Sequence, residues 1–264
     1  MAVHAHPDDE AIGTGGILAR YSAEGARTVL VTCTNGEQGD ATGGAKPGEG
    51  AHDPSEVAAI RLNELRRAAD ILGVSHLELL GYRDSGMVGW AANDDPGVFC
   101  NVPLEEAAGR ISALIARYRP QVVVTYDENG FYGHPDHIQA HRATVAAVEA
   151  SGDATKVYYT AVPKTAVAEL RKQLVEAGAN LGDEDFSGDF GTPDELVTTE
   201  VNVSGYVGQK LEALKAHASQ TENFFMASLS EEAMATAMSR EWFTLRSAPQ
   251  GFGGETDLFA GVRE

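Results

Sequence analysis

Two short segments of the chain concentrate the residue types that catalyse hydrolysis. His4-Ala-His-Pro-Asp-Asp-Glu10 contains two imidazoles and three carboxylates, and Gly133-His-Pro-Asp-His137 adds two imidazoles and a carboxylate. A polar loop with a helix cap is the better explanation for either segment alone, because a lone His-Pro-Asp match is weak. Each segment, however, follows a stretch typical of a buried strand. We therefore expect the two to meet in space around one metal ion.

Metal binding is the first chemistry that these residue types allow. His6, Asp9 and His137 offer two imidazole nitrogens and one carboxylate oxygen. Three such ligands leave one coordination position for water, as in catalytic zinc sites. The same ligand set also suits ferrous iron, so both Zn²⁺ and Fe²⁺ fit the pattern. The two cysteines, Cys33 and Cys100, are too few for a thiolate zinc site.

The remaining polar residues of the two segments can move protons. Asp8 points away from its neighbour Asp9 and can take a proton from a metal-bound water, whose pKa zinc lowers to about 7. His134 can donate to an oxyanion as an imidazolium, with Asp136 placed to orient it and hold its charge. A metal, a base and an oxyanion donor form a complete set for the hydrolysis of an amide.

The elements that must position these residues alternate along the first 150 residues. β-branched runs predict strands, and apolar residues at helical spacing predict helices. Asp53 is predicted to be the N-cap of a helix that begins with Pro54. Strands are predicted at residues 3–5, 28–34, 77–82, 121–127, 157–162 and 197–203, and helices at residues 10–23, 54–73, 104–118, 137–150, 165–177, 205–217 and 230–239.

Alternation of strands and helices is typical of a parallel sheet covered on both faces. We therefore predict an α/β fold, a Rossmann-like three-layer sandwich with a mostly parallel sheet and a variable C-terminal third. One hydrolase domain is expected over residues 1–264, with residues 1–155 as the βα core and residues 156–264 as C-terminal strands, helices and tail. A surface insertion is expected at residues 178–193, and the Gly-rich tail from Ser247 is expected to form a cover or arm.

The charge balance excludes several classes of partner. The formal net charge is −19 at pH 7, whereas nucleic acids and anionic membranes require a basic surface. No apolar run approaches the ~20 residues of a membrane span, and no signal peptide is visible. The sequence therefore predicts a soluble, cytoplasmic protein that binds neither nucleic acid nor membrane. It gives no indication of the oligomeric state.

Ala5-His-Pro-Asp-Asp-Glu10 and Gly133-His-Pro-Asp-His137, in this order, resemble the paired motifs of the LmbE-like (PIG-L) zinc N-deacetylases. The resemblance covers residues 3–150 and extends to Ala213-Leu-Lys-Ala-His-Ala-Ser-Gln220. Within the family, the chain is most similar to the mycothiol branch, which contains the GlcNAc-inositol deacetylase and the mycothiol S-conjugate amidase. The resemblance implies a small-molecule amino-sugar substrate whose N-acetyl group is hydrolysed.

The resemblance also implies roles for individual residues. These are zinc ligation by His6, Asp9 and His137, base catalysis by Asp8, oxyanion stabilisation by His134 with Asp136 behind it, assistance by a mobile Tyr132, and contacts with sugar or inositol hydroxyls by Arg61 and Asp84. Arg61 fits a surface pair with Glu64 equally well, because the two are three residues apart on a predicted helix. His217 is isolated in the sequence and is expected to have a surface or structural role.

The exact substrate stays open because the chain departs from the patterns of both enzymes. Three residues after the Glu of the first motif, the deacetylase has serine and the amidase has lysine, where this chain has Gly13. Asp127-Glu-Asn-Gly130 looks more like the amidase, whereas Gly133 and Gly86-Met87 look more like the deacetylase. The S-conjugate amidase and natural-product or glycolipid sugar deacetylases are therefore alternatives.

Three other classes of protein fit only part of the pattern. A non-catalytic metal- or sugar-binding protein would be expected to have a broken site, whereas base, ligands and oxyanion donor are all present here. A ferrous oxygenase would need a reductant, and the adjacent Asp8 favours hydrolysis. His4-x-His6 with Asp8 resembles part of a metallo-β-lactamase motif, but Asp9 stands where that motif has a histidine.

Overall fold

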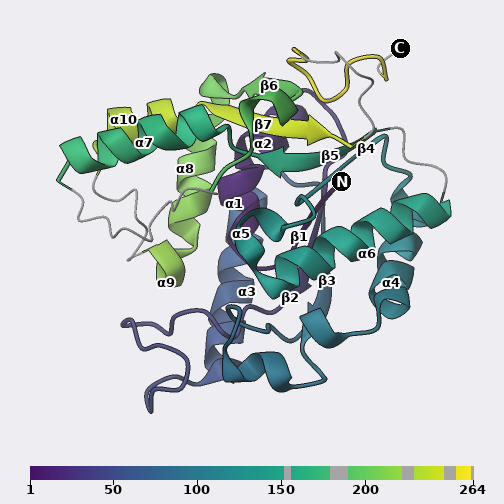
Figure 1. The fold of residues 1–264 in the computed structure, drawn as a ribbon, viewed down its shortest axis with the longest axis vertical. Helices are drawn as coiled ribbons and strands as arrows, with labels where there is room; N and C mark the ends of the chain where they lie inside the picture. The colour runs from purple at the N-terminus through teal and green to yellow at the C-terminus, as the bar shows by residue number, and fades with distance from the viewer. Residues whose placement is uncertain (152–155, 179–189, 222–228, 247–253, 263–264) are drawn as a thin grey trace.

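The computed structural model describes residues 1–151, 156–178, 190–221, 229–246 and 254–262. Within them, one seven-stranded sheet has the order β3-β2-β1-β4-β5-β7-β6 (Figure 1). The strands are β1 Ala2–His4, β2 Val29–Thr34, β3 His76–Tyr82, β4 Val122–Thr125, β5 Lys156–Ala161, β6 Thr199–Asn202 and β7 Arg240–Leu245. The helices are α1 Asp9–Gly13, α2 Gly15–Ala23, α3 Pro54–Ile71, α4 Leu104–Tyr118, α5 Gly130–Gly133, α6 Pro135–Ser151, α7 Lys164–Glu176, α8 Val207–Ala216, α9 Ala218–Thr221 and α10 Glu231–Ala237.

The order of the strands places the site at a switch point of the sheet. Strands β1, β2 and β3 follow one another toward one edge, and β4 and β5 continue from β1 toward the other. All four pairings among these five strands are parallel. Between β1 and β4 the direction of strand addition reverses, and ligands bind outside the carboxyl ends of strands at such a point. The two histidine-bearing segments directly follow β1 and β4.

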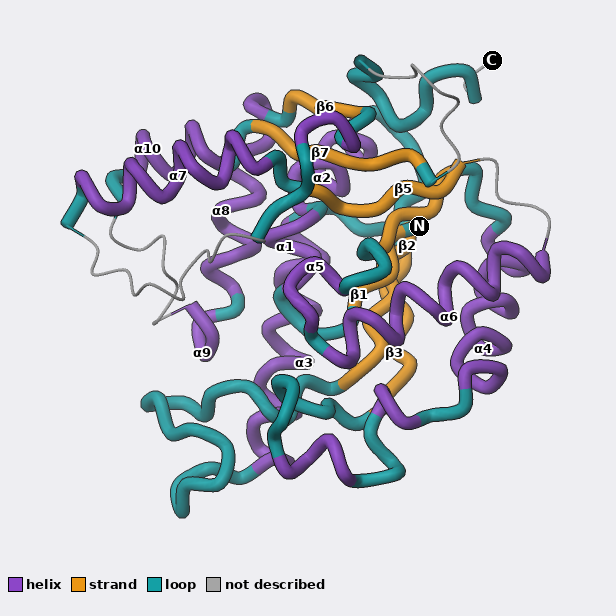
Figure 2. The backbone as a smooth tube through the Cα atoms, viewed as in Figure 1, coloured by secondary structure: helices purple, strands orange, loops and turns teal. Residues whose placement is uncertain are grey.

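The central strands are buried on both faces, which explains their runs of apolar residues. Val3 and Val31 belong to a core cluster with Ile111 of α4 and Ala140 of α6. Their sequence neighbours, Ala2 and Leu30, belong to a second core cluster on the opposite face of the sheet. That cluster also contains one residue each from α2, α3 and α8: Leu18, Leu65 and Leu214. Figure 2 shows the strands as one continuous band with helices on either side. The predicted α/β fold with a mostly parallel sheet is therefore confirmed.

The N-cap predicted for α3 is confirmed: the Asp53 side chain accepts hydrogen bonds from the backbone N–H groups of Ser55 and Glu56. The other helices of the first 150 residues are close to their predicted ranges, with one exception. The single helix predicted over residues 10–23 is wrong, because the chain breaks at Thr14 (φ −141°) into α1 and α2. The short helix α5 was also not expected.

A buried carboxylate from the far end of the chain holds the start of α2. Glu241 of β7 accepts the backbone N–H groups of Gly16 and Ile17, both at 2.8 Å, and Lys210 of α8 donates to the same carboxylate at 2.6 Å. Position 16 requires glycine, because a Cβ there would lie 2.5 Å from Val203. The hydrogen bonds from Gly16 and Ile17 to Glu241 explain why a new helix, α2, begins after Thr14.

The C-terminal third extends the same sheet by two antiparallel strands. β7 pairs with β5 and β6 pairs with β7, both antiparallel, and β7 was not predicted. Helices α7, α8 and α10 are close to their predicted ranges. Most of the insertion predicted at 178–193 and the first part of the predicted tail, residues 247–253, lie outside the described residues. Among the helices that are described, none is long and apolar enough to cross a bilayer.

Candidate metal centre and active site

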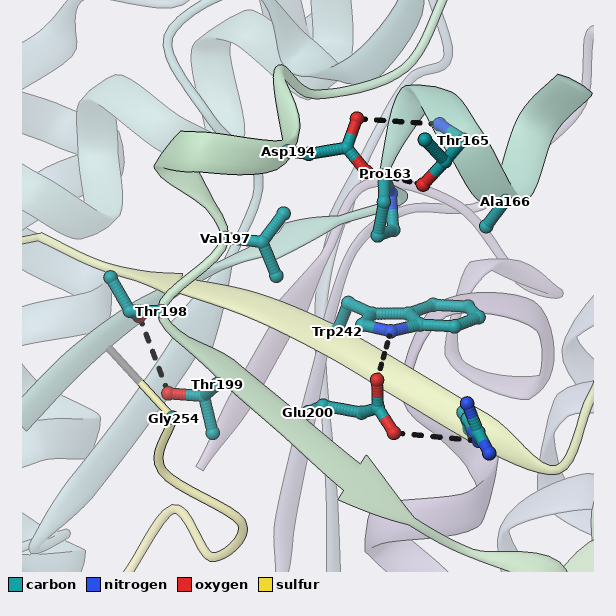
Figure 3. A pocket seen from close by; sticks show the side chains of 11 residues that line it. Pro163, Thr165, Ala166, Asp194, Val197, Thr198, Thr199, Glu200, Trp242 and Gly254 are labelled. Carbon is teal, nitrogen blue, oxygen red and sulfur yellow. Dashed lines mark hydrogen bonds and ion pairs between the residues drawn. The ribbon is translucent and has the colours of Figure 1, made fainter.

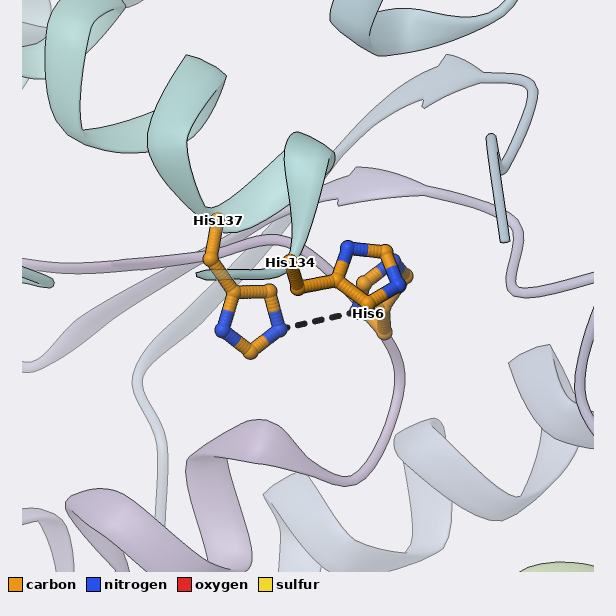
Figure 4. A group of neighbouring side chains, drawn as sticks. All are labelled: His6, His134 and His137. Atoms are coloured by element: carbon orange, nitrogen blue, oxygen red, sulfur yellow. Dashed lines mark hydrogen bonds between the residues drawn. The ribbon is translucent and has the colours of Figure 1, made fainter. Parts of the chain in front are cut away.

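The three predicted metal ligands come together at the switch point. The Nδ1 atom of His6 lies 3.2 Å from Nε2 of His137 and 3.4 Å from Oδ2 of Asp9. The third distance, from His137 Nε2 to Asp9 Oδ2, is 3.5 Å. His6 and His137 are buried, and Asp9 is partly accessible. Figure 4 shows the rings of His6 and His137 beside that of His134.

These spacings fit an ion with tetrahedral coordination. Ligand atoms about 2.0–2.1 Å from a zinc ion are about 3.3–3.4 Å from one another in a tetrahedral site. Burial lowers the pKa of His137 to about 4, so this ring is neutral and able to bind metal near pH 7. Burial opposes the charge of Asp9, but His137 and His6 together hold the pKa of that carboxyl well below its ordinary value. The triad thus includes one neutral imidazole, of His137, and one ionised carboxylate, of Asp9.

Asp84 and Asp136 approach the second nitrogen of His6. Its Nε2 lies 3.2 Å from Oδ2 of Asp136 and 3.5 Å from Oδ1 of Asp84. Oδ2 of Asp136 also accepts the backbone N–H of Ser85 at 2.9 Å. Burial alone would lower the pKa of His6, but Asp84 and the hydrogen bonds with these carboxylates raise it well above its ordinary value. Metal binding at Nδ1 would therefore compete with a proton on His6.

The structure changes the expected relation between His134 and Asp136. The carboxylate of Asp136 contacts His6, whereas His134 Nδ1 accepts the backbone N–H of Asp136 at 3.2 Å. A nitrogen that accepts a hydrogen bond carries no hydrogen, so this contact favours the tautomer protonated on Nε2. Burial lowers the pKa of His134 to about 3, and His6 and His137 add to the effect. The geometry favours a neutral imidazole in place of the imidazolium suggested by the sequence.

Two further groupings of potential ligands share His6. His6, His134 and His137 offer ligand atoms that lie within 4.8 Å of one another, and so do His6, Asp84 and Asp136. Asp136 Oδ1 is buried without a hydrogen-bond partner among the described residues. The whole cluster is therefore rich in donors for a cation, with His6 at its centre.

Asp8 lies beside the triad in a conformation that few non-glycine residues adopt. Its φ angle is 120°, and such conformations cost of order 1–3 kcal/mol. Arg61 Nη2 donates to Oδ2 of Asp8 at 3.1 Å and to the carbonyl of Pro7 at 2.6 Å, while Nη1 donates to the carbonyl of Gly36 at 2.6 Å. Burial raises the pKa of Asp8 to about 6, with Arg61 opposing the rise.

The structure excludes one of the two roles predicted for Arg61, which were a contact with substrate hydroxyls and a surface pair with Glu64. The alternative of a surface pair is wrong, because Arg61 is 4% exposed. Its guanidinium holds the loop around Asp8 and lies 4.0 Å from Oδ2 of Asp84. Asp84 is buried as well, and its Oδ1 accepts the backbone N–H of Gly86 at 2.8 Å. Both predicted substrate-binding residues therefore lie in the wall of the site, next to Asp8 and His6.

Tyr132 lies beside the histidine cluster and is partly exposed to solvent. Its side chain is 44% exposed, and its ring centroid is 5.0 Å from that of His137 and 6.0 Å from that of His134. It belongs to the irregular helix α5, where the preceding residue Phe131 has a φ angle of 68°. An exposed ring next to two histidines is suitably placed to meet a bound substrate.

Three residues of the site were missed or undervalued from the sequence. Tyr126, at the end of β4, donates its hydroxyl hydrogen to Oδ2 of Asp9 at 2.7 Å. Glu10 and His217 are both fully buried, with Oε1 and Nε2 2.6 Å apart. Tyr126 belongs to the Val-Thr-Tyr-Asp stretch at a strand end, which is a usable signal. His217 lies in the family-like stretch Ala213–Gln220, but its partner could not be named from the sequence because Glu10 lies 207 residues earlier.

A separate hollow of about 440 Å³ lies at the β6–β7 edge of the sheet (Figure 3). Trp242, Glu200 and Arg240 line it, and their polar groups pair with one another: Trp242 Nε1 donates to Glu200 at 3.1 Å, and Arg240 lies 3.4 Å from the same side chain. No catalytic set is assembled there among the described residues, so the chemistry is concentrated at the histidine cluster.

Comparison with known proteins identifies the family of the chain. The model of the PIG-L family, described as GlcNAc-PI de-N-acetylase, matches residues 1–148. A 1D-myo-inositol 2-acetamido-2-deoxy-alpha-D-glucopyranoside deacetylase of Acidothermus cellulolyticus is 44% identical over 276 residues, covering 99% of this chain and 94% of the relative. A protein of the same description from Catenulispora acidiphila is 42% identical and covers 99% of this chain and 88% of the relative.

Solved structures share the fold. The N,N'-diacetylchitobiose deacetylase of Pyrococcus horikoshii superposes with a TM-score of 0.58 at 20% identity, covering 92% of this chain and 82% of that one. At this identity the likeness concerns the arrangement of sheet and helices alone. The sequence relatives and the family model carry the assignment: the chain belongs to the PIG-L family of de-N-acetylases.

Proposed function

We propose that this protein is a zinc-dependent N-deacetylase that hydrolyses the acetamide of N-acetylglucosamine linked to inositol. The observation that carries the proposal is the triad of His6, Asp9 and His137 with the carboxylate of Asp8 beside it. Support for the substrate comes from relatives above 40% identity over nearly the whole chain that bear the name of this activity. The products are acetate and the free amine.

In this proposal, His6, Asp9 and His137 hold the zinc ion. A zinc ion held there would polarise the amide carbonyl and would make a water molecule acidic enough to lose a proton near pH 7. Asp8 accepts that proton as the general base. The same carboxyl group then passes a proton to the nitrogen of the leaving amine, which a carboxyl with a pKa of about 6 can do near neutral pH.

The neighbouring side chains stabilise the charge that develops on the amide oxygen. His134 donates a hydrogen bond from Nε2, because its Nδ1 is occupied as an acceptor. Tyr132, half-exposed beside His137, is a second donor that can approach when substrate binds. Arg61 and Asp84 line the wall next to Asp8, where Asp84 can also meet a sugar hydroxyl. Asp136 orients His6 instead of His134.

One comparison of substrates tests the proposal. Purified protein is assayed for amine release from GlcNAc-inositol and, in parallel, for cleavage of a mycothiol S-conjugate and deacetylation of a glycopeptide sugar. The proposal expects the first substrate to have the highest kcat/KM. Higher kcat/KM for the S-conjugate would identify the amidase, which uses the same site on a longer substrate. Hydrolysis of none of the three would contradict the proposal.

A second test concerns the metal. Removal of metal with a chelator is expected to abolish turnover, and stoichiometric Zn²⁺ is expected to restore it. Ferrous iron, added without oxygen, is the matched comparison, because its ligand preferences overlap with those of zinc at this site. Full activity of the metal-free protein would rule out the proposed chemistry.

A further inference from the structure

Glu10 and His217 form a buried pair that reaches the backbone of Asp8. Both side chains are fully buried, and Nε2 of His217 lies 2.6 Å from Oε1 of Glu10. The other carboxylate oxygen of Glu10, Oε2, accepts the backbone N–H of Asp8 at 3.0 Å. Each oxygen of this carboxylate thus has a partner, one in the first loop of the chain and one at the end of α8.

The backbone of Asp8 needs such a restraint. With φ at 120°, the residue occupies a region that its own side chain disfavours, so it stays there only if surrounding contacts determine it. Arg61 restrains the preceding carbonyl, of Pro7, and the Asp8 carboxylate. Glu10 restrains the amide between them. The direction in which the Asp8 carboxylate points follows from these contacts.

The segment that carries His217 is itself fixed at two residues, Ser219 and Gln220. Ser219 donates to Glu64 of α3 from its backbone N–H at 2.9 Å and from its hydroxyl at 2.7 Å. Gln220 exchanges two hydrogen bonds with the backbone of Asp40. His217 is therefore held at a set distance from the loop after β1. A buried histidine ring at this position can pair with the buried Glu10 carboxylate, whose burial without a partner would cost free energy.

We propose that Glu10 and His217 are positioning residues for Asp8: His217 holds the Glu10 carboxylate, and that carboxylate holds the strained Asp8 backbone so that its side chain meets the attacking water. The proposal rests on the proposed function. It predicts that loss of the pair lowers kcat, because the base is displaced, while the metal ligands and the substrate contacts stay in place.

The test compares two amide substitutions at one position. In His217→Gln, the side-chain nitrogen ends near the place of the imidazole Nε2 and can donate to Glu10. In His217→Asn, the amide is one methylene shorter and cannot reach. We expect His217→Asn to lower kcat by about 10–100-fold, as is usual when a supporting residue of a metal site is lost, and His217→Gln to keep most of the activity. KM and zinc content should match wild type in both.

A second pair of variants tests the carboxylate itself and guards against misfolding at position 217. Glu10→Gln keeps an acceptor for the Asp8 amide and is expected to retain more activity than Glu10→Met, which has similar volume but no acceptor. Lys215→Met is the control, because it removes an exposed ion pair with Glu212 from the helix that precedes His217 without touching Glu10. It is expected to leave kcat at the wild-type value. Thermal midpoints are recorded for every variant.

The outcomes separate this inference from the proposed function. If wild-type protein hydrolyses GlcNAc-inositol and both variants at position 217 match its kcat, the inference is overturned. Equal losses in the Gln and Asn variants, or a loss of zinc in His217→Asn, overturn it as well. If wild type itself is inactive on GlcNAc-inositol, the proposed function has failed, and the kinetic comparison is made with whichever amide substrate it cleaves.

Discussion

The hydroxyl group of Tyr126 lies between Asp9 and the backbone of Ala5. It donates to Oδ2 of Asp9 at 2.7 Å and accepts the N–H of Ala5 at 2.9 Å. This is the oxygen of Asp9 that faces both His6 and His137. Tyr126, directly after β4, therefore helps to orient a proposed ligand, together with the backbone N–H of His6, which donates to the same oxygen at 2.8 Å.

Replacing Tyr126 by Phe is expected to weaken zinc binding. The ring is retained, so the packing changes little, but Asp9 loses one of the two hydrogen bonds that orient its Oδ2. Loss of such a contact to a metal ligand typically costs 10–100-fold in metal affinity. Competition with a zinc chelator measures the effect, and Tyr206→Phe outside the site is the control. Unchanged zinc affinity would show that Asp9 is oriented by other contacts.

Asp8→Ala is expected to keep zinc and to lose turnover by about 10²–10⁴-fold, the usual contribution of a general base. The exposed Asp70→Ala on α3 controls for loss of an acidic charge. Metal analysis and steady-state kinetics are run on the same preparations. Full activity of Asp8→Ala would remove Asp8 from the mechanism.

Arg61→Lys distinguishes support of the loop from contact with substrate. A lysine ammonium cannot reproduce the fork that contacts the carbonyls of Pro7 and Gly36. We expect a fall in kcat of about 10–100-fold with little change in KM, by analogy with other supporting residues of metal sites. Arg66→Lys, exposed on the same helix, should behave as wild type. A rise in KM alone would indicate a direct sugar contact.

Lys210→Met is expected to destabilise the fold strongly. It leaves the buried Glu241 carboxylate without its cation, and breaking a buried pair in this way costs about 3–5 kcal/mol in the free energy of unfolding. Lys215→Met on the same helix removes an exposed cation that pairs with Glu212 and should change stability little. Urea denaturation compares the two, and equal midpoints would contradict the role given to Lys210.

Asp53 gives a prediction about pH. Hydrogen bonds from the Ser55 side chain and from the backbone of Ser55 and Glu56 lower its pKa in the folded state. A carboxyl with a lowered folded pKa stabilises the fold above its unfolded pKa of about 3.9, and this contribution is lost as pH falls further. Asp53→Asn keeps the cap but cannot ionise. Its stability should therefore fall less than that of wild type between pH 5 and 3, which thermal denaturation measures.

Sequence reasoning located most of the first half because strand and helix patterns there are local. Asp53-Pro54 shows how a few adjacent residues determine a helix start, and the segments at residues 4–10 and 133–137 each carried their ligands in one short stretch. The break at Thr14 was missed because it depends on Glu241, which no local pattern connects to Gly16. Strand β7 was missed for a related reason, because its pairing with β5 and β6, which lie earlier in the chain, cannot be read from its own residues.

The candidate site was also predictable only where its residues lie in short sequence motifs. His6, Asp9 and His137 could be named from the motifs, whereas the residues that orient them could not. Asp136 was assigned to His134 because they are neighbours in the sequence, but the fold brings His6 to its carboxylate. His217 was undervalued because its partner is distant in the chain. Contacts of this kind need the three-dimensional arrangement.

The Glu241 carboxylate at the start of α2 also has a consequence for the order of events during synthesis. Gly16 and Glu241 are 225 residues apart. At about 5–20 residues per second, a ribosome needs roughly 10 to 45 seconds to pass from one to the other. During that interval the amides of Gly16 and Ile17 have no native partner, although the segment bearing His6 and Asp9 has already emerged. The start of α2 thus gains its buried carboxylate partner late, after β7 has been synthesised.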